Sequence, residues 1–355
     1  MPKVSIVILN YNGKRFLNDC ISSVLKQDFT DYEIILVDNN SSDGSADFIR
    51  EKFLQIKLIQ SDKNLGFAGG NNLGVNHSSG ELIVLLNNDT VTKDNWLKNL
   101  VAAVDKDNVA IASPLILNEH TPMKYWERKG SINFLGHNIM LVFSKEEEIF
   151  SSSGACLIYK KDLLGIPFDE DYFAYSEDVY LGLRARFMGY EIHHTNNSEI
   201  YHFEGGSFNR TPNQLKTFIQ ERNRLLNMFL FFSLKTNLKL IPIYLFNIIT
   251  KLSVALIFGW HKKYKKYSLP GLLQAYFWFI RNISLVLNKR KKLASQKSIN
   301  EKNVIKFMTY KLDNGESLPG KFINYMAKIY FTVVNIRTYE FYHDSSTGRL
   351  NTTLY

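Results

Sequence analysis

Short apolar runs alternate with amphipathic segments over the first ninety residues of the chain. Apolar runs of this length are typical of strands that are buried on both faces, and apolar residues repeated about every 3.6 positions indicate helices. The expected elements are strands at residues 4–9, 33–37, 56–60 and 81–86, and helices at residues 14–27, around 48–53 and at 66–76. This alternating order predicts an α/β fold with a parallel sheet covered by helices on both faces.

Polar residues follow three of these strands at the point where the apolar run stops. They are residues 10–13 (Asn-Tyr-Asn-Gly), residues 38–44, which begin at Asp38, and residues 87–89 (Asn-Asn-Asp). Open α/β sheets bind ligands beyond the carboxyl ends of their strands, so Asp38 and Asp89 are expected to converge on one edge. A carboxylate there can hold a hard cation against a phosphate. The pattern therefore indicates a phosphate-bearing substrate.

Composition is that of a globular protein with a substantial core, since 45% of the 355 residues are hydrophobic. Cys20 and Cys156 lie far apart within apolar patterns. We therefore expect two buried thiols in a reducing compartment, rather than a disulfide or a metal site. No signal peptide precedes the first strand, which predicts that the catalytic region faces the cytoplasm.

Charge divides the chain into two regions. Residues 1–205 hold 19 Lys/Arg and 28 Asp/Glu, a balance of −9, whereas residues 206–355 hold 24 and 6, a balance of +18. This segregation predicts an acidic enzyme core at residues 1–210, followed by a basic, mainly helical region at residues 211–355.

Five blocks in sequence resemble the inverting glycosyltransferases of family 2. They are residues 4–13, 37–44, 64–71, 86–90 and 168–178, the last continuing through Arg184 to residue 190. The resemblance covers roughly residues 3–205 and is greatest to the branch of rhamnosyltransferase-like enzymes. It implies a GT-A-type, Rossmann-like domain with a mixed, mainly parallel sheet that binds a nucleotide-sugar donor. Residues 119–150 would be an acceptor-side insertion.

The resemblance also implies the donor-binding residues. Asp38 would accept hydrogen bonds from the nucleobase, with Asn10 and Tyr11 bordering the base. The loop of Asn64 and Gly66 would let the backbone approach the donor. Each has a simpler interpretation. Asp38 would be a turn or capping residue, Tyr11 a packed aromatic at the rim, and the loop of Asn64 and Gly66 a helix-entry turn.

Residues 87–89 occupy the place of the family's Asp-x-Asp motif, with Asn87 in place of the first carboxylate. Asn87 and Asn88 would contact the donor, and Asp89 would hold the metal, either Mg²⁺ or Mn²⁺. His202 resembles the family's histidine that completes the metal shell, although a structural or surface role is equally open.

A pair of acidic residues, Glu177 and Asp178, begins a predicted helix. The resemblance assigns Asp178 as the general base that deprotonates the acceptor hydroxyl, and partial burial would raise its pKa usefully. Helix capping is the alternative. Glu177 and Arg184 are secondary candidates. Arg222 is a third candidate, which would contact the diphosphate, although its pattern favours a solvated helix face.

Residues 119–150 are where acceptor specificity is expected, and the Glu run at 146–148 predicts a solvated face. Residues 155–159 should rejoin the sheet as a strand. Two apolar stretches follow in the basic region, at residues 240–260 and 272–287, next to Lys clusters at 262–266 and 289–292.

These features predict two amphipathic helices lying in an anionic membrane interface, that is, peripheral attachment at the cytoplasmic face of the membrane. One membrane span is an alternative, although Lys251 near the middle of the first stretch disfavours it. A helical homo-oligomer interface is another. No nucleic-acid-reading module is evident.

The sequence thus predicts a metal-dependent, inverting glycosyltransferase that acts on a hydroxyl of a lipid-linked or cell-envelope glycan. Rhamnose from a deoxythymidine-diphosphate donor is suggested by the resemblance alone. A sugar nucleotidyltransferase would need an Arg/Lys-bearing Gly-rich loop after the first strand, and an oxidoreductase would need Gly-x-Gly-x-x-Gly there. Residues 10–13 provide neither. An inactive membrane-bound scaffold, arising from the Asn87 change, is the remaining alternative.

Overall fold

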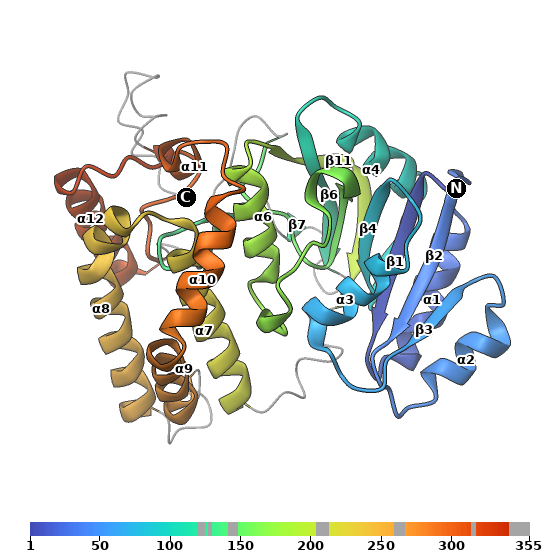
Figure 1. Cartoon of the computed structure of the whole chain (residues 1–355), viewed down its shortest axis with the longest axis horizontal. Coiled ribbons are helices and arrows are strands. Elements are labelled where there is room, and N and C mark those ends of the chain that lie inside the picture. The colour runs from blue at the N-terminus through green and yellow to red at the C-terminus, as the bar shows by residue number, and fades with distance from the viewer. Residues whose placement is uncertain are drawn as a thin grey trace.

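The structure is a computed structural model, and it describes residues 1–118, 125–126, 130–140, 148–203, 213–258, 267–313 and 317–340. Figure 1 shows two parts side by side, a sheet with its covering helices and a group of C-terminal helices, with α6 between them.

One mixed sheet of nine strands forms the first part, within the residues that the structure describes. Its order is β3-β2-β1-β4-β10-β6-β11-β5, with β7 paired to β6. Pairing is parallel from β3 to β4 and antiparallel on both sides of β10, and β11 runs parallel to β6. The strands are β1 (Val4–Asn10), β2 (Tyr32–Asp38), β3 (Lys57–Gln60), β4 (Leu82–Asn87), β5 (Thr90–Thr92), β6 (Val109–Asn118), β7 (Tyr125–Trp126), β10 (Cys156–Lys160) and β11 (Glu191–His202). The α/β fold with a mixed, mainly parallel sheet is confirmed.

Helices cover both faces of this sheet, as the wholly apolar strands require. One face packs against α1, α2 and α4, and the other against α3 and α6. Helix α3 has the predicted bounds, whereas α1 ends two residues earlier than predicted. The helices are α1 (Lys14–Leu25), α2 (Ser45–Lys52), α3 (Gly66–Asn76), α4 (Trp96–Val104), α5 (Lys161–Leu164), the 3-10 turn η1 (Glu170–Tyr172) and α6 (Glu177–Phe187). Cys20 and Cys156 are buried free thiols, as predicted.

The C-terminal part is helical, as predicted, and shares a hydrophobic core with the sheet. Buried aromatic residues join the two parts, since Phe231 of α7 packs on Phe187 and Tyr180 of α6. The helices are α7 (Asn213–Phe231), α8 (Leu234–Phe258), α9 (Leu269–Arg281), α10 (Ile283–Ala294), α11 (Glu301–Ile305) and α12 (Leu318–Val333).

The acceptor-side insertion of the prediction lies partly outside the described residues. Its described part includes the hairpin of β8 (Gly130–Ile132) and β9 (Asn138–Met140). This hairpin docks on the C-terminal part, since Ser131 Oγ donates to the Phe307 carbonyl at 2.6 Å and Asn133 Nδ2 to the Lys311 carbonyl at 3.0 Å. Residues 119–124 and 141–147 are not described.

Candidate active site

A buried polar network joins the carboxyl ends of three neighbouring strands. Strand register places Asn10 of β1 beside Asp38 of β2, and Leu9 beside Asn87 of β4. Asn10 Nδ2 donates to Asp38 Oδ1 at 3.2 Å, and Asn10 Oδ1 accepts from Asn88 Nδ2 at 2.6 Å. Asn10 therefore connects Asp38 with Asn88, the residue before Asp89.

The loop before α3 is held against the same edge. Asn64 Oδ1 accepts hydrogen bonds from Asn39 Nδ2 at 3.0 Å and from the Gly66 amide at 2.8 Å. Gly66 has φ of +72°, and a Cβ there would clash with the carbonyl oxygen of Phe173. A glycine is thus required by both backbone conformation and close approach. Tyr11 is half-buried just beyond β1, where the prediction places it next to the base.

Asp89 and His202 form the candidate metal site. Asp89 is buried, and its Oδ1 lies 3.2 Å from His202 Nε2 at the end of β11. A carboxylate oxygen and an imidazole nitrogen this close can both reach one divalent cation; the carboxylate suits Mg²⁺ or Mn²⁺, whereas the imidazole nitrogen suits a transition-metal ion such as Mn²⁺ better than Mg²⁺. No cluster of three or more His, Cys, Asp or Glu suited to a metal is present among the described residues. Within those residues the site therefore offers two ligands, and phosphate oxygens and water would supply others.

Two adjacent carboxyls, Glu177 and Asp178, begin α6. Asp178 Oδ1 accepts from the Val179 amide at 2.8 Å. Burial raises the pKa of Asp178, although backbone donors at Val179 and Gly154 partly oppose that rise. Burial, and then the neighbouring Asp178, raises the pKa of Glu177 to about 8. Glu177 Oε2 has no hydrogen-bond partner within the described part of the chain. A base with a raised pKa is the arrangement that proton abstraction needs.

The loop that leads into α6 has a strained backbone. Phe173, Tyr175 and Ser176 all have positive φ, between 59° and 67°. Non-glycine residues adopt this conformation only when their surroundings impose it. The buried amide of Asn223 on α7 imposes it here, donating to the carbonyls of Tyr172, Ala174 and Tyr175 at 2.9, 2.8 and 2.7 Å. A C-terminal helix thus fixes the backbone that presents the candidate base.

Asn227 adds two further contacts from the next turn of α7. Its Nδ2 donates to the Ser176 carbonyl at 3.0 Å, and its Oδ1 accepts from Tyr172 Oη at 2.6 Å. Sequence reasoning missed both Asn223 and Asn227. The available signal was two asparagines four positions apart, on one helix face.

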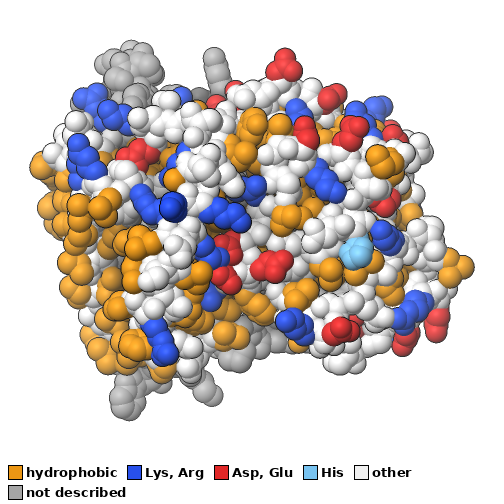
Figure 2. Space-filling view, viewed as in Figure 1, with side chains coloured by type: hydrophobic (Ala, Val, Ile, Leu, Met, Phe, Trp, Pro, Cys, Tyr) orange, Lys and Arg blue, Asp and Glu red, His pale blue; other side chains and the backbone are white. Residues whose placement is uncertain are grey.

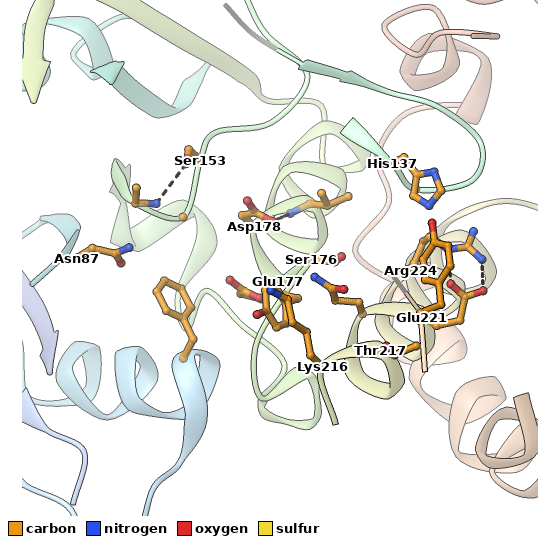
Figure 3. A pocket seen from close by; sticks show the side chains of 18 of the residues that line it. Asn87, His137, Ser153, Ser176, Glu177, Asp178, Lys216, Thr217, Glu221 and Arg224 are labelled. Atoms are coloured by element: carbon orange, nitrogen blue, oxygen red, sulfur yellow. Dashed lines mark hydrogen bonds and ion pairs between the residues drawn. The ribbon is translucent and has the colours of Figure 1, made fainter. Parts of the chain in front are cut away.

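One cavity of about 750 Å³ brings these groups together. Asn87, His202 and Asp178 all line it, and Figure 3 shows Asp178 and Glu177 between Asn87 on one side and Arg224 on the other. Asp89 reaches the cavity wall through its contact with His202. The candidate metal site and the candidate base therefore face a shared cavity.

The far wall of this cavity carries a charged cluster that the sequence did not predict. Glu221 of α7 is buried and accepts from Arg224 at 2.5 Å, Lys251 at 2.7 Å and Tyr276 Oη at 2.9 Å. Burial alone would raise the pKa of Glu221, but Arg224 and Lys251 outweigh burial and hold it well below its usual range. Lys251 Nζ also lies 3.3 Å from His137 Nε2. We call Glu221, Arg224 and Lys251 the α7–α8 cluster.

Two of the secondary candidates hold the protein together instead of lining the cavity. Arg184 donates to the carbonyls of Leu164 and Ile166 at 2.6 and 2.7 Å. Arg222 donates to the Asp171 carbonyl at 2.5 Å and lies over the Trp278 ring at 5.2 Å. The predicted solvated face for Arg222 is wrong, because η1 and α9 bury it.

The Glu run of the insertion also differs from the prediction in its described member. Glu148 forms an ion pair with Arg186, which is buried, so this carboxylate is not on a merely solvated face. Arg186 needs that partner because an unpaired buried charge is costly. Glu146 and Glu147 lie outside the described residues.

The family model for glycosyl transferase family 2 matches residues 5–165, which include all the strands of the donor edge. Residues 5–165 belong to glycosyl transferase family 2. The chain is accordingly a glycosyltransferase, with the GT-A-like fold followed by helices. The match stops before Asp178 and α7, so the base and the α7–α8 cluster lie in the part that the family model does not cover.

Two relatives of this chain are named as glycosyltransferases. An uncharacterized glycosyltransferase of Haemophilus influenzae is 27% identical over 239 residues, covering 61% of this chain and 72% of the relative. The Escherichia coli UDP-Glc:alpha-D-GlcNAc-diphosphoundecaprenol beta-1,3-glucosyltransferase WfgD is 32% identical over 108 residues, covering 30% of this chain and 43% of WfgD.

A solved structure supports the fold. The crystal structure of GalNAc-T7 with UDP, GalNAc and Mn²⁺ has a TM-score of 0.54 and 14% identity, covering 79% of this chain and 58% of that one. At that identity the likeness concerns the fold alone.

Proposed function

We propose that this protein is an inverting, metal-dependent glycosyltransferase that moves a sugar from a nucleoside diphosphate to a hydroxyl of a lipid-linked or cell-envelope glycan. The observation that supports the proposal is the shared cavity, which is lined both by Asp178 and by His202 of the Asp89–His202 pair. Inversion in a single displacement needs the base and the diphosphate in one cavity, because the base must approach the anomeric carbon from the side away from the diphosphate.

Each residue then has a defined task. The edge of Asn10, Asp38 and Asn88 would hold the nucleoside, and Asp178 would accept the proton of the acceptor hydroxyl as the new bond forms. A divalent cation held by Asp89 and His202 would offset the negative charge that develops on the leaving diphosphate. The Mn²⁺ bound by GalNAc-T7 and the single carboxylate at residues 87–89 are both compatible with this role.

The finer substrate assignments rest on resemblance. Rhamnose from a deoxythymidine-diphosphate donor is our proposed sugar, because the five sequence blocks are most similar to rhamnosyltransferase-like enzymes. A lipid-linked acceptor is proposed because WfgD is named for a diphosphoundecaprenol-linked acceptor.

Replacing the base tests the proposal. Donors are first identified by thermal stabilisation with a panel of nucleotide sugars, with and without Mn²⁺, and turnover is then compared for the wild type and Asp178→Asn. Loss of a positioned base should lower turnover by roughly 10²–10⁴-fold while nucleotide binding persists. Asp162→Asn, an exposed aspartate on α5, is the matched control and should retain wild-type turnover. Undiminished turnover by Asp178→Asn removes the base assignment, and binding without turnover by the wild type would favour the scaffold alternative.

We also propose that α8, α9 and α12 attach the enzyme peripherally to an anionic membrane at its cytoplasmic face. Helix α8 is long and apolar enough to cross a membrane, by length and composition. It packs on the body through one face, which includes Lys251, and exposes apolar residues on the other. Figure 2 shows apolar side chains gathered at this end of the molecule, with Lys and Arg nearby. The exposed large hydrophobic residues of α8 are Leu234, Leu238, Ile241, Leu245, Phe246, Ile249, Leu256 and Ile257.

Vesicle sedimentation tests this attachment. The wild type should sediment with vesicles of phosphatidylcholine and phosphatidylglycerol more than with phosphatidylcholine alone, and salt should weaken binding. Leu245→Lys should reduce sedimentation. Leu54→Lys, at an exposed leucine next to α2 at the other end of the molecule (Figure 1), should not. Equal loss in both variants, or a dimer that forms without lipid and is broken only by Leu245→Lys, would contradict peripheral attachment.

A further inference from the structure

Among the residues that the structure describes, the α7–α8 cluster combines two cations with one carboxylate. Glu221 contributes one negative charge, whereas Arg224 and Lys251 contribute two positive charges, and all three side chains are buried. Both Glu221 oxygens already accept two hydrogen bonds each, from Arg224, Lys251 and Tyr276. An excess charge in a low-dielectric site is costly unless an anion offsets it.

The cluster opens into the cavity of the active site. Arg224 and Lys251 line that cavity together with Lys216, which lies 5.7 Å from the centre of the Tyr175 ring. Lys216 makes no ion pair with a carboxylate in the described residues. Three cations of the C-terminal part therefore line the cavity, and Figure 3 shows Arg224 on the side away from Asn87.

The position of these cations in the cavity indicates which substrate they would bind. The donor diphosphate belongs at Asp89 and His202, on the wall that Asn87 shares. Asp178 lies between that wall and the cluster (Figure 3). A molecule that places its hydroxyl at Asp178 and extends away from the donor must therefore pass along Arg224 and Lys251.

We propose that the α7–α8 cluster, with Lys216, is an acceptor subsite that binds an anionic group of the acceptor, a phosphoryl or a carboxylate. This inference rests on the proposed glycosyl transfer and specifies its acceptor class as acidic. Glu221 is the positioning residue, since its four hydrogen bonds fix the Arg224 guanidinium and the Lys251 ammonium. A diphosphate in a lipid-linked acceptor and a uronic-acid carboxylate share the required chemistry.

Equilibrium binding of alkyl probes tests the subsite without catalysis. Octyl diphosphate and octyl glucuronide represent the two sources of charge, and neutral octyl glucoside is the matched control, each titrated below its micelle concentration. We expect one or both charged probes to bind at least about tenfold more tightly than the glucoside, with an affinity that falls as salt rises. The probe that binds more tightly identifies the source of the anion. Equal binding of all three would overturn the proposal, because it indicates only apolar contact with α8.

Variants separate this subsite from the donor site. Lys251→Met and Lys216→Gln should weaken binding of the charged probe about tenfold, and Lys251→Arg should restore most of it. Asp89→Asn should impair nucleoside-diphosphate binding and leave the charged probe unaffected. Thermal unfolding of each variant checks that it is folded.

If Asp89→Asn alone abolishes binding of the charged probe, the probe binds at the donor site and the proposed subsite is refuted. If Lys251→Met lowers stability without changing the affinity for the probe, the cluster has only a structural role, and the proposed subsite is again refuted. Failure of nucleotide binding in the wild type would instead contradict the proposed function.

Discussion

Glu177 should make the stability of this glycosyltransferase fall as the pH rises. The side chain is only 6% exposed, and its Oε2 lacks a partner among the described residues, so the folded protein favours the protonated carboxyl. Its pKa is raised from 4.5 to about 8, chiefly by burial and then by Asp178. That difference corresponds to roughly 5 kcal/mol of unfolding free energy at one pKa unit per about 1.4 kcal/mol.

The sign follows from linkage. Because the folded pKa lies above the unfolded one, the stabilising effect of the proton is fully present below about pH 4.5 and is lost as the pH rises towards about 8. Glu177→Gln keeps the shape of the side chain and removes its titration. The unfolding free energy of the variant minus that of the wild type should therefore increase by about 1.4 kcal/mol per pH unit between about pH 5 and pH 8.

Urea unfolding of both proteins over this pH range measures the difference. Glu51→Gln, at an exposed glutamate of α2, is the control and should give a difference that does not change with pH. A difference between Glu177→Gln and the wild type that is also constant with pH would refute the burial argument, because it would mean that Glu177 titrates alike in the folded and unfolded states.

Three further predictions concern the backbone around the site and the core. Asn223→Ala should lower the unfolding free energy by about 2–4 kcal/mol in urea unfolding, since it removes the side-chain donor to the carbonyls of Ala174 and Tyr175 and one of the donors to the Tyr172 carbonyl. A change below about 0.5 kcal/mol would contradict this. Gly66→Ala should destabilise the protein more than Gly165→Ala in thermal unfolding. Both glycines have positive φ, but only a Cβ at Gly66 would meet Phe173. Equal losses of stability in the two variants would assign the whole effect to φ. The thiol of Cys20, whose pKa burial raises to about 12, should react with a thiol reagent only after denaturation, and rapid labelling of the native protein would show that it is accessible.

The donor edge could be predicted from sequence because local pattern determines it. An apolar run identifies a buried strand, and the residue after the run then lies at the sheet edge, which placed Asn10 and Asp38 next to each other at the ends of β1 and β2. The α3 helix, with its Gly- and Asn-rich composition, was likewise predicted with the bounds that the structure has.

The acceptor side could not be predicted because it depends on contacts between distant segments. Asn223 bonds to carbonyls about fifty positions earlier in the chain. Whether Arg222 is solvated depends on α9, whose Trp278 covers it, and no pattern within α7 contains that information. The ion pair of Lys251 with Glu221 on another helix could not be predicted from the apolar stretch in which Lys251 lies.

The side-chain amides of Asn223 and Asn227 on α7 determine what a shortened form of the protein would lose. A shortened product ending near residue 205 would keep every residue of the family match yet lose Asn223 and Asn227, which hold the backbone beside Asp178. Such a fragment is expected to retain the nucleotide-binding edge without the geometry for proton removal. Under the proposed function, recognition of the activated sugar and its transfer are thus encoded in separate stretches of the gene.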